Sequence, residues 1–158
     1  MIVRMDDLEW VTHAHGERYA ARRKKLGAWG ERLGASVFEL EPGKAAFPKH
    51  AHLGNEEAIF VLSGRATLEV GEERLEVRAG DWVALPAGAE FAHKVVNTSD
   101  ALVRYLCVST MSEPDVVLYP DTGKVGVFAG APPGGDKVAR TLHAYLDGAA
   151  ERGYWEGE

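Results

Sequence analysis

Cysteine is nearly absent from this sequence: Cys107 is the single one among 158 residues. One cysteine excludes an internal disulfide framework and is typical of proteins that fold in a reducing compartment. The sequence therefore predicts a cytoplasmic protein. Cys107 lies in the apolar run of residues 102–108, so we interpret it as a small buried hydrophobe rather than a reactive thiol.

Basic residues and long apolar stretches are also scarce. Lys and Arg total 18 against 24 Asp and Glu, a formal net charge of −6, which leaves no basic footprint for nucleic acid or anionic lipid. The first ten residues carry acids where a signal peptide needs basic residues. No run approaches the roughly 20 apolar residues of a membrane span. We expect a small-molecule ligand or substrate, and neither nucleic acid nor a membrane, as partner.

What is present indicates one globular domain. The length gives room for a single core, and 18 glycines indicate many turns. We divide the chain into an N-terminal extension (1–34), a barrel core (35–110) and a C-terminal extension (111–158) that packs on the barrel or on a partner subunit.

The barrel core carries the pattern of short strands. In residues 65–70, Ala66, Leu68 and Val70 alternate with polar residues, as in a half-buried strand. A Gly-containing turn leads into residues 74–78, which alternate again, so the pair predicts a hairpin. Further strands are expected at 35–41, 57–63, 82–85, 93–96 and 101–109. Such spacing is typical of an antiparallel sandwich or barrel.

The flanking segments are less regular. Residues 17–33 are expected to form one irregular helix, or a helical turn and a loop broken at Gly27 and Gly30. A short helix is expected over about residues 137–146, because Val138, Leu142 and Tyr145 or Leu146 recur at helical spacing. The terminal pair Tyr154 and Trp155 predicts an arm docked on the barrel or on a partner, since disordered tails are poor in aromatics.

One cluster of residues points to metal chemistry. His50 and His52 are two apart and share a face of a strand, and Glu57 opens the next strand after a four-residue turn, so the three side chains can converge. His13 and His15 have the same spacing, but no carboxylate follows at a matching distance. We interpret that second pair as a surface feature.

The wider spacing resembles the two motifs of the cupin superfamily. The first string is Gly43, His50, His52, Glu57 and Gly64, and the second is Gly80, Pro86, Gly88, His93 and Asn97. Two gaps are longer than in the usual pattern: six residues separate Gly43 from His50, and four separate Gly88 from His93. Both lie in turns, where a change of length costs little. The second gap is similar to that of small bacterial cupins described as sugar-phosphate isomerases.

The resemblance implies an all-β fold, the cupin or double-stranded β-helix (jelly-roll) antiparallel barrel. It also implies that His50, His52, Glu57 and His93 bind one metal ion. Glu57 is preferred to Glu56 because the family places six residues between this ligand and Gly64. A shift of one residue would also turn the carboxylate out of the barrel.

Three imidazoles and one carboxylate suit a divalent transition metal: Zn, Fe, Mn, Ni or Co, with Cu also compatible. An octahedral ion would keep two positions open for a bidentate oxygen ligand or for dioxygen, whereas tetrahedral zinc would be saturated.

Neighbouring residues are candidates for the barrel interior and for substrate contact: Phe47, Ile59 and Trp82, with Val61 and Val95 as interior residues. Arg104 is either an anchor for a phosphate or carboxylate, or an outward-facing side chain. Asn97 is expected to end a strand, and Lys49 and Lys94 to point away from the ligands.

Three functions remain open at this point. The first is a metal-dependent enzyme, of the isomerase kind, acting on a sugar phosphate, keto acid or diol. The second is a metal dioxygenase, and the third a non-catalytic sensor or storage module. Because a barrel of this size has edge strands to cover, and family members usually pair through them, we also expect a homodimer.

Overall fold

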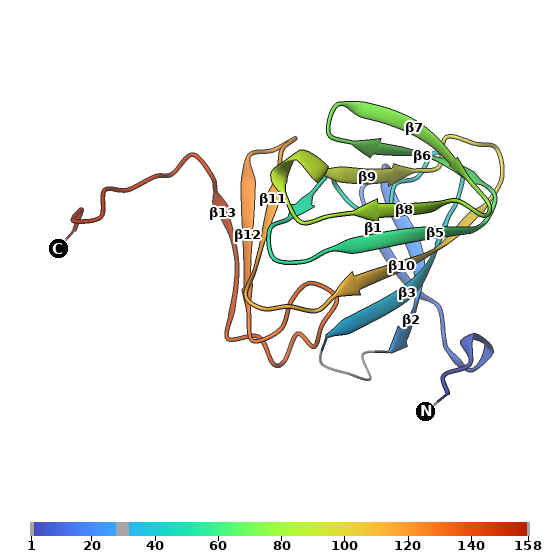
Figure 1. Ribbon diagram of the computed structural model, residues 1–158, viewed down its shortest axis with the longest axis horizontal. Coiled ribbons are helices and arrows are strands. Elements are labelled where there is room, and N and C mark those ends of the chain that lie inside the picture. The colour runs from blue at the N-terminus through green and yellow to red at the C-terminus, as the bar shows by residue number, and fades with distance from the viewer. Residues whose placement is uncertain (1, 28–31, 158) are drawn as a thin grey trace.

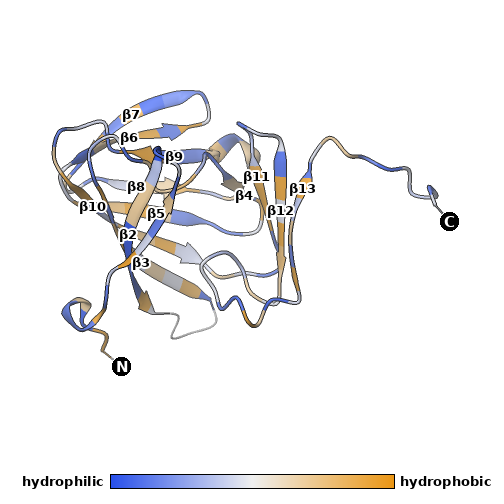
Figure 2. Ribbon diagram, turned by 180° about the vertical axis from the view of Figure 1, so that it is seen from behind, coloured by the Kyte–Doolittle hydropathy of each residue, from blue (hydrophilic) through white to orange (hydrophobic). Residues whose placement is uncertain are grey.

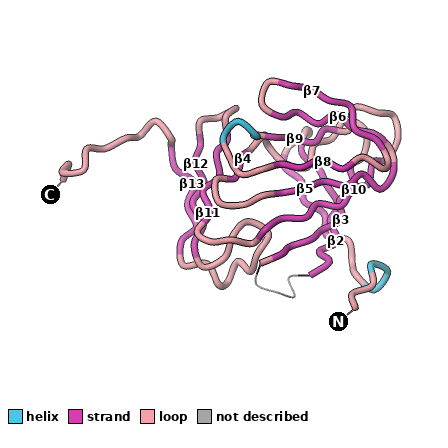
Figure 3. Tube along the Cα trace, in the orientation of Figure 1, coloured by secondary structure: helices cyan, strands magenta, loops and turns pink. Residues whose placement is uncertain are grey.

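The computed structural model describes residues 2–27 and 32–157, and strands dominate it (Figure 3). The first part contains a short 3-10 turn η1 (Met5–Asp7) and the strands β1 (Val11–His15), β2 (Tyr19–Gly27), β3 (Leu33–Leu40), β4 (Ala51–His52), β5 (Glu57–Ser63), β6 (Arg65–Val70) and β7 (Glu73–Arg78). The second part contains β8 (Trp82–Leu85), the 3-10 turn η2 (Ala89–Phe91), β9 (His93–Val96), β10 (Val103–Thr110), β11 (Asp115–Tyr119), β12 (Lys124–Ala129) and β13 (Leu142–Asp147).

The strands form three antiparallel sheets. One has six strands in the order β1-β2-β3-β10-β5-β8, one has the order β7-β6-β9, and one has the order β13-β12-β11-β4. The first two sheets face each other and form the jelly-roll barrel, while β11, β12 and β13 stand across one end of it (Figure 1). The all-β prediction is confirmed, and so is the hairpin formed by β6 and β7.

The core lies between the six-stranded and the three-stranded sheets. Alternation along β5 turns Ile59 and Val61 inward, where they are almost completely buried, and β6 contributes Ala66 and Leu68 from the opposite side. On β7 only Val77 is buried; its other residues are exposed and, apart from Leu75, hydrophilic (Figure 2). This one-sided pattern is what a sheet with one face in solvent requires.

Two motif residues have structural reasons for their identity. Gly64 has φ 79°, and a Cβ there would lie 2.7 Å from the carbonyl oxygen of Leu102, so only glycine fits the turn between β5 and β6. Asn97, fully buried just after β9, donates hydrogen bonds to the carbonyl oxygens of Leu40 and Ala101, both at 2.8 Å. The expectation that Asn97 ends a strand is confirmed.

The helix expected within residues 17–33 is wrong where the structure describes it. Residues 19–27 form β2, which pairs with β1 on one side and β3 on the other. The basic run of residues 22–25 favours a solvated surface or helix end from the sequence alone, with a phosphate contact as the alternative. Long aliphatic stems let such residues lie on both faces of a strand, and Lys24 is in fact buried. Gly30 lies outside the described residues.

The helix expected near residues 137–146 is also wrong, because residues 142–147 form β13 and pair with β12 along its whole length. Val138, expected on the apolar face of that helix, is 92% exposed. The tail after β13 leaves the body of the molecule (Figure 1), and Tyr154 and Trp155 are exposed. Docking of this arm on its own barrel is therefore not found; docking on a partner stays a prediction. None of the helices in residues 2–27 and 32–157 has the length and apolar character of a membrane span.

Candidate metal centre

Three short segments bring the four predicted ligands to one place inside the barrel. His50 and His93 face each other through two backbone hydrogen bonds, of 3.0 and 2.7 Å, between the segments before β4 and at the start of β9. His52 ends β4, which pairs with β11, and Glu57 is the first residue of β5. The turn between His52 and Glu57 thus returns the chain to the same point, as the spacing predicts.

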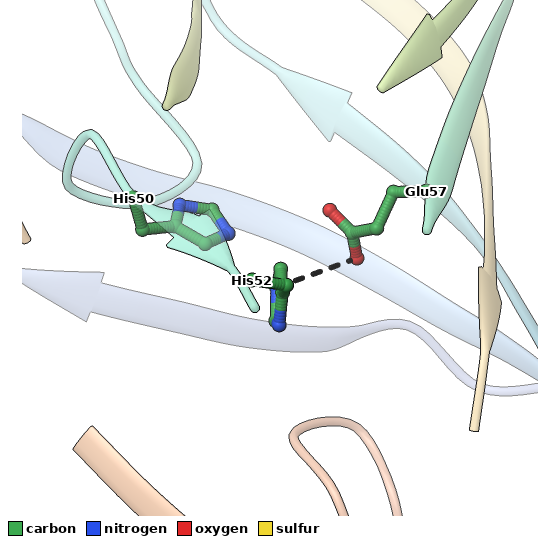
Figure 4. Close-up of side chains that lie close together, drawn as sticks. All are labelled: His50, His52 and Glu57. Atoms are coloured by element: carbon green, nitrogen blue, oxygen red, sulfur yellow. Dashed lines mark ion pairs between the residues drawn. The ribbon is translucent and has the colours of Figure 1, made fainter. Parts of the chain in front are cut away.

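The side chains of His50, His52 and Glu57 point toward one another (Figure 4). His50, His52 and Glu57 each offer a ligand atom, and these atoms lie within 4.8 Å of one another. The Nε2 atom of His93 lies 3.1 Å from Oε2 of Glu57, and Nε2 of His52 lies 3.9 Å from Oε1. Glu56, by contrast, is exposed, and its backbone N–H donates to Oγ1 of Thr110. The carboxylate in the group is that of Glu57.

Each imidazole is tied to the protein through Nδ1. His50 is 2.9 Å from the carbonyl oxygen of Pro48, and His93 is 3.1 Å from that of Phe91. A carbonyl oxygen only accepts, so Nδ1 carries the proton in both rings and, in the neutral form, Nε2 keeps a lone pair. This is the tautomer that metal binding through Nε2 requires.

His52 is oriented by a residue that the sequence pattern did not suggest. Its Nδ1 lies 2.6 Å from Oδ2 of Asp115, the first residue of β11, which is completely buried. Oδ1 of Asp115 accepts from the backbone N–H of Gly54 at 3.1 Å. The short apolar run 116–119, followed by Pro120 and the turn residues 121–123, could have predicted β11. It could not have predicted the contact, which joins residues 63 positions apart in the chain.

Burial and the neighbouring charges shift the pKa values in this group. Burial, together with the charge of His93, lowers the pKa of His50 to about 4. Burial works against ionisation of Glu57 too, but the hydrogen bond with His93 and the nearby His52 outweigh it and lower its pKa to about 2. For His52, burial is outweighed by the hydrogen bond to Asp115, which raises its pKa. The group thus contains an ionised carboxylate beside a neutral His50 at neutral pH.

A cavity of about 460 Å³ opens from this group, a size typical of small-molecule sites. Ile59, Phe47 and Val95 line it, as expected, together with Cys107. Cys107 is half-buried, and burial followed by the charge of Glu57 raises the pKa of its thiol, which agrees with an unreactive side chain. Lys49 and Lys94 bond away from the ligands, to the carbonyl of Gly71 and to Glu69.

Two of the four residues considered for substrate contact lie elsewhere. Trp82 is 60% exposed on the outer face of β8, so the interior placement is wrong. Side chains alternate between the two faces of a strand, so residues three positions apart point to opposite sides. Leu85 of β8 is buried, and Trp82 therefore points outward. Arg104 is likewise on the outer face, where it pairs with the buried Glu39 and lies near the ring of Trp10.

The C-terminal sheet closes one end of the cavity, which the sequence reading did not anticipate. Tyr119 of β11 stacks near His50, with ring centroids 6.2 Å apart, and Phe128, His143 and Tyr145 of β12 and β13 also line the wall. His13, interpreted as a surface residue, lies on the exposed strand β1 and reaches the same cavity.

Known proteins resemble this chain in sequence and in fold. Residues 36–109 match the family model of the cupin domain. A quercetin 2,3-dioxygenase from Bacillus subtilis is 32% identical over 123 residues, which is 75% of this chain and 35% of the relative. An uncharacterised protein from Methanocaldococcus jannaschii is 32% identical over 60 residues. The chain spans 35% and 46% of the lengths of these two curated relatives.

Two solved structures match nearly the whole chain. A candidate sugar phosphate isomerase from Acidithiobacillus ferrooxidans has a TM-score of 0.77 and 26% identity, covering 93% of this chain and 90% of that one. A sugar phosphate isomerase of the cupin superfamily from Silicibacter pomeroyi has a TM-score of 0.76 and 22% identity, covering 93% and 92%. The second likeness shows the fold alone.

Proposed function

Because this chain belongs to the cupin superfamily, we propose that its barrel binds one divalent transition-metal ion and uses it to act on a small oxygenated metabolite. The ligands are His50, His52, Glu57 and His93. One observation carries the proposal: the Nδ1 atoms of all three histidines are bonded to oxygen atoms of the protein, and Nε2 of His52 and of His93 lies near Glu57.

The donor set fits such an ion. Neutral imidazoles and an ionised carboxylate are borderline ligands that suit Zn, Fe, Mn, Ni or Co. The pKa of His50, lowered to about 4, keeps this ring neutral, and the pKa of Glu57, lowered to about 2, keeps its charge. Asp115 stands behind His52 as the orienting carboxylate that such histidines usually have.

The bound ion would supply Lewis acidity toward a carbonyl or hydroxyl oxygen of the substrate. The chain contributes the rest. Ile59, Phe47 and Val95 form an apolar wall that excludes water, and the C-terminal sheet covers the site with Tyr119 close to His50. Glu57, as a ligand, is not available as a base. Proton transfer therefore falls to another group of the lining, and His143 is the candidate, since burial raises the pKa of the Tyr119 hydroxyl and makes it a poor base.

We favour an isomerase-like reaction because the candidate sugar phosphate isomerase matches almost the full length of both chains. The second candidate is a dioxygenase, favoured by the 32% identity to the quercetin dioxygenase, although this chain spans only 35% of that relative. A binding module without catalysis is the third, and it would use the same metal centre.

The metal proposal is tested by elemental analysis of the protein purified without a histidine tag. We expect about one metal ion per chain, and its loss in the His50→Ala/His52→Ala variant. The matched control is His13→Ala/His15→Ala, which removes the same spacing from β1 and should keep the metal. Equal metal contents in the first variant and the unmodified protein would refute the proposal.

The reaction class needs a second experiment on the metal-loaded protein. Interconversion of an aldose phosphate and its ketose, followed by NMR, supports the isomerase. Oxygen consumption with a flavonol supports the dioxygenase, and binding of either compound without turnover supports the binding module.

A further inference from the structure

Positive charge gathers around the cavity that leads to the metal centre. Arg23 and Lys25 of β2 line it, and Lys137 lines it from the loop between β12 and β13. Among the described residues Glu57, deep in the site, is the one acidic side chain of the lining. The excess of cations contrasts with the net charge of −6 for the whole chain.

Other basic residues of this wall already have partners. Lys94 pairs with Glu69 at 2.9 Å, Lys124 lies over the ring of Tyr119, and Arg140 donates hydrogen bonds to backbone carbonyls of its own loop. These contacts explain their positions without a ligand.

Arg23, Lys25 and Lys137 differ from them. Within residues 2–27 and 32–157, none of the three makes an ion pair or a side-chain hydrogen bond. Arg23 is half-buried opposite Phe38, and burial lowers its pKa, though an arginine stays charged at neutral pH. Partial burial of a guanidinium without a hydrogen-bond acceptor costs free energy, unless a bound anion accepts its hydrogen bonds and balances its charge.

The three cations share one part of the cavity. Burial and the charges of Arg23 and Lys137 lower the pKa of His13, so both charges lie near that ring. Lys25 is two residues after Arg23 and therefore lies on the same face of β2, where it pairs with Ser36 of β3. Cys107 lies between this region and the metal centre. Its Sγ is 3.9 Å from Oε1 of Glu57, and the charge of Arg23 acts to lower the pKa of its thiol, against the larger effect of burial.

We infer that Arg23, Lys25 and Lys137 form a subsite for the anionic group of a metabolite whose oxygenated end reaches the metal ligands past Cys107. The contact of the oxygenated end with the metal ligands rests on the proposed function. Three cations exceed what one carboxylate needs, so a phosphate monoester, which carries nearly two charges, fits better. The substrate is then a small phosphorylated hydroxy or carbonyl compound.

Calorimetric titration of the metal-loaded protein with D-ribose 5-phosphate, D-ribose and D-glucuronate tests the subsite. These probes offer similar oxygen atoms with a phosphate, no anion and a carboxylate. We expect the phosphate to bind at least about tenfold more tightly than the neutral sugar, with the carboxylate between them. Equal affinities for all three would overturn the inference, and preference for glucuronate would reassign the subsite to carboxylates.

Single substitutions test whether Arg23 and Lys137 bind the phosphate group. Arg23→Gln should lose about tenfold in affinity for ribose 5-phosphate and nothing for ribose, and Lys137→Gln, a change at an exposed loop residue, should lose several-fold. Arg65→Gln removes the same charge from the exposed start of β6 and is the matched control. If Arg65→Gln weakens binding as much as Arg23→Gln, or if Lys137→Gln changes nothing in a folded protein, the subsite is wrong.

Inorganic phosphate tests the anion subsite separately from the metal centre. Binding of inorganic phosphate to the His50→Ala/His52→Ala protein does not depend on the metal. If it persists and is lost on adding Arg23→Gln, the subsite stands even when no metal is found. If inorganic phosphate binds equally with and without Arg23, the subsite falls while the metal centre is untouched.

Discussion

Asp115 is the residue on which the orientation of His52 depends. Its Oδ2 holds Nδ1 of the ring at 2.6 Å, and the remaining oxygen is occupied by the N–H of Gly54. We expect Asp115→Asn to weaken metal binding about tenfold and Asp115→Ala about a hundredfold, because asparagine keeps an acceptor without the charge and alanine keeps neither. Competition with a chromogenic chelator measures both.

The control for this prediction is Asp100→Asn, an exposed residue in the turn after β9. It should leave the affinity unchanged. Were the two Asp115 variants to bind metal like the unmodified protein while melting at a lower temperature, Asp115 would be a structural residue only.

His50 makes the stability of the metal-free protein depend on pH. Its pKa is lowered to about 4 by burial, below the ordinary 6.5. Between these values the unfolded chain binds a proton at His50 and the folded chain does not, so the stabilising contribution is complete above pH 6.5 and is lost as the pH falls to 4. The shift corresponds to about 3 kcal/mol of unfolding free energy.

Urea denaturation of chelator-treated protein between pH 4 and 7 checks this, with His50→Gln as reference. The difference in unfolding free energy between the unmodified protein and His50→Gln should shrink as the pH falls. Glu57 stabilises the folded protein above its ordinary pKa of 4.5, and this contribution is lost only as the pH falls from 4.5 toward 2, so it is nearly constant over most of the range. A constant difference across the range would contradict the prediction.

At the scale of elements, Asn97 ties three strands together. Its side-chain N–H groups donate to Leu40 at the end of β3 and to Ala101 before β10, and its oxygen accepts from Ser99. Asn97→Ala removes these hydrogen bonds from a fully buried position, and we expect a loss of about 2–4 kcal/mol in the free energy of unfolding. Thr98→Ala, at the exposed neighbour, should cost less than about 1 kcal/mol. Similar losses for both would disprove the role of Asn97.

The strands from 35 to 110 were predictable because each feature that defines them is local. Period-two alternation places Ile59 and Val61 inward, and the same alternation sets Glu57 on the inner face with them. Asp115 and Arg23 were not predictable, because their roles depend on pairings between distant strands. For Arg23, the basic run of residues 22–25 allowed a phosphate contact but favoured a solvated surface or helix end, and it did not show which of these residues face the interior; successive residues face opposite sides of β2.

The C-terminal sheet shows where a helical pattern and a strand pattern compete. Leu142 and Tyr145 fit a helical stripe, but β12 offered an unpaired edge beside them, and the hydrogen bonds of a second strand satisfy that edge. Local spacing contains no information on which neighbour is available. The fold of the core therefore follows from the sequence pattern, whereas the cover of the cavity follows from tertiary pairing.

At the scale of the whole molecule, we propose that two copies pair through the outer face of β5, β8 and β10. Leu106, Phe60 and Trp82 form a cross-strand row there, and Leu62 adds to it. Trp82 is 60% and Leu62 41% exposed. The row carries no charge and ends at β8, the edge strand of its sheet. A second copy related by a two-fold axis would bury the same patch on both sides.

Light scattering coupled to size exclusion should therefore give about twice the chain mass of 17.2 kDa. Trp82→Glu places a charge in the centre of the patch and should give a monomer with an unchanged circular dichroism spectrum, whereas Leu75→Glu, at an exposed leucine of β7 outside the patch, should stay dimeric. If the exposed arm also contacts the partner, Tyr154→Ser/Trp155→Ser raises the dissociation constant of the dimer. A 17.2 kDa particle for the unmodified chain would rule out the pairing, and a dimer that survives Trp82→Glu would move the interface to another face.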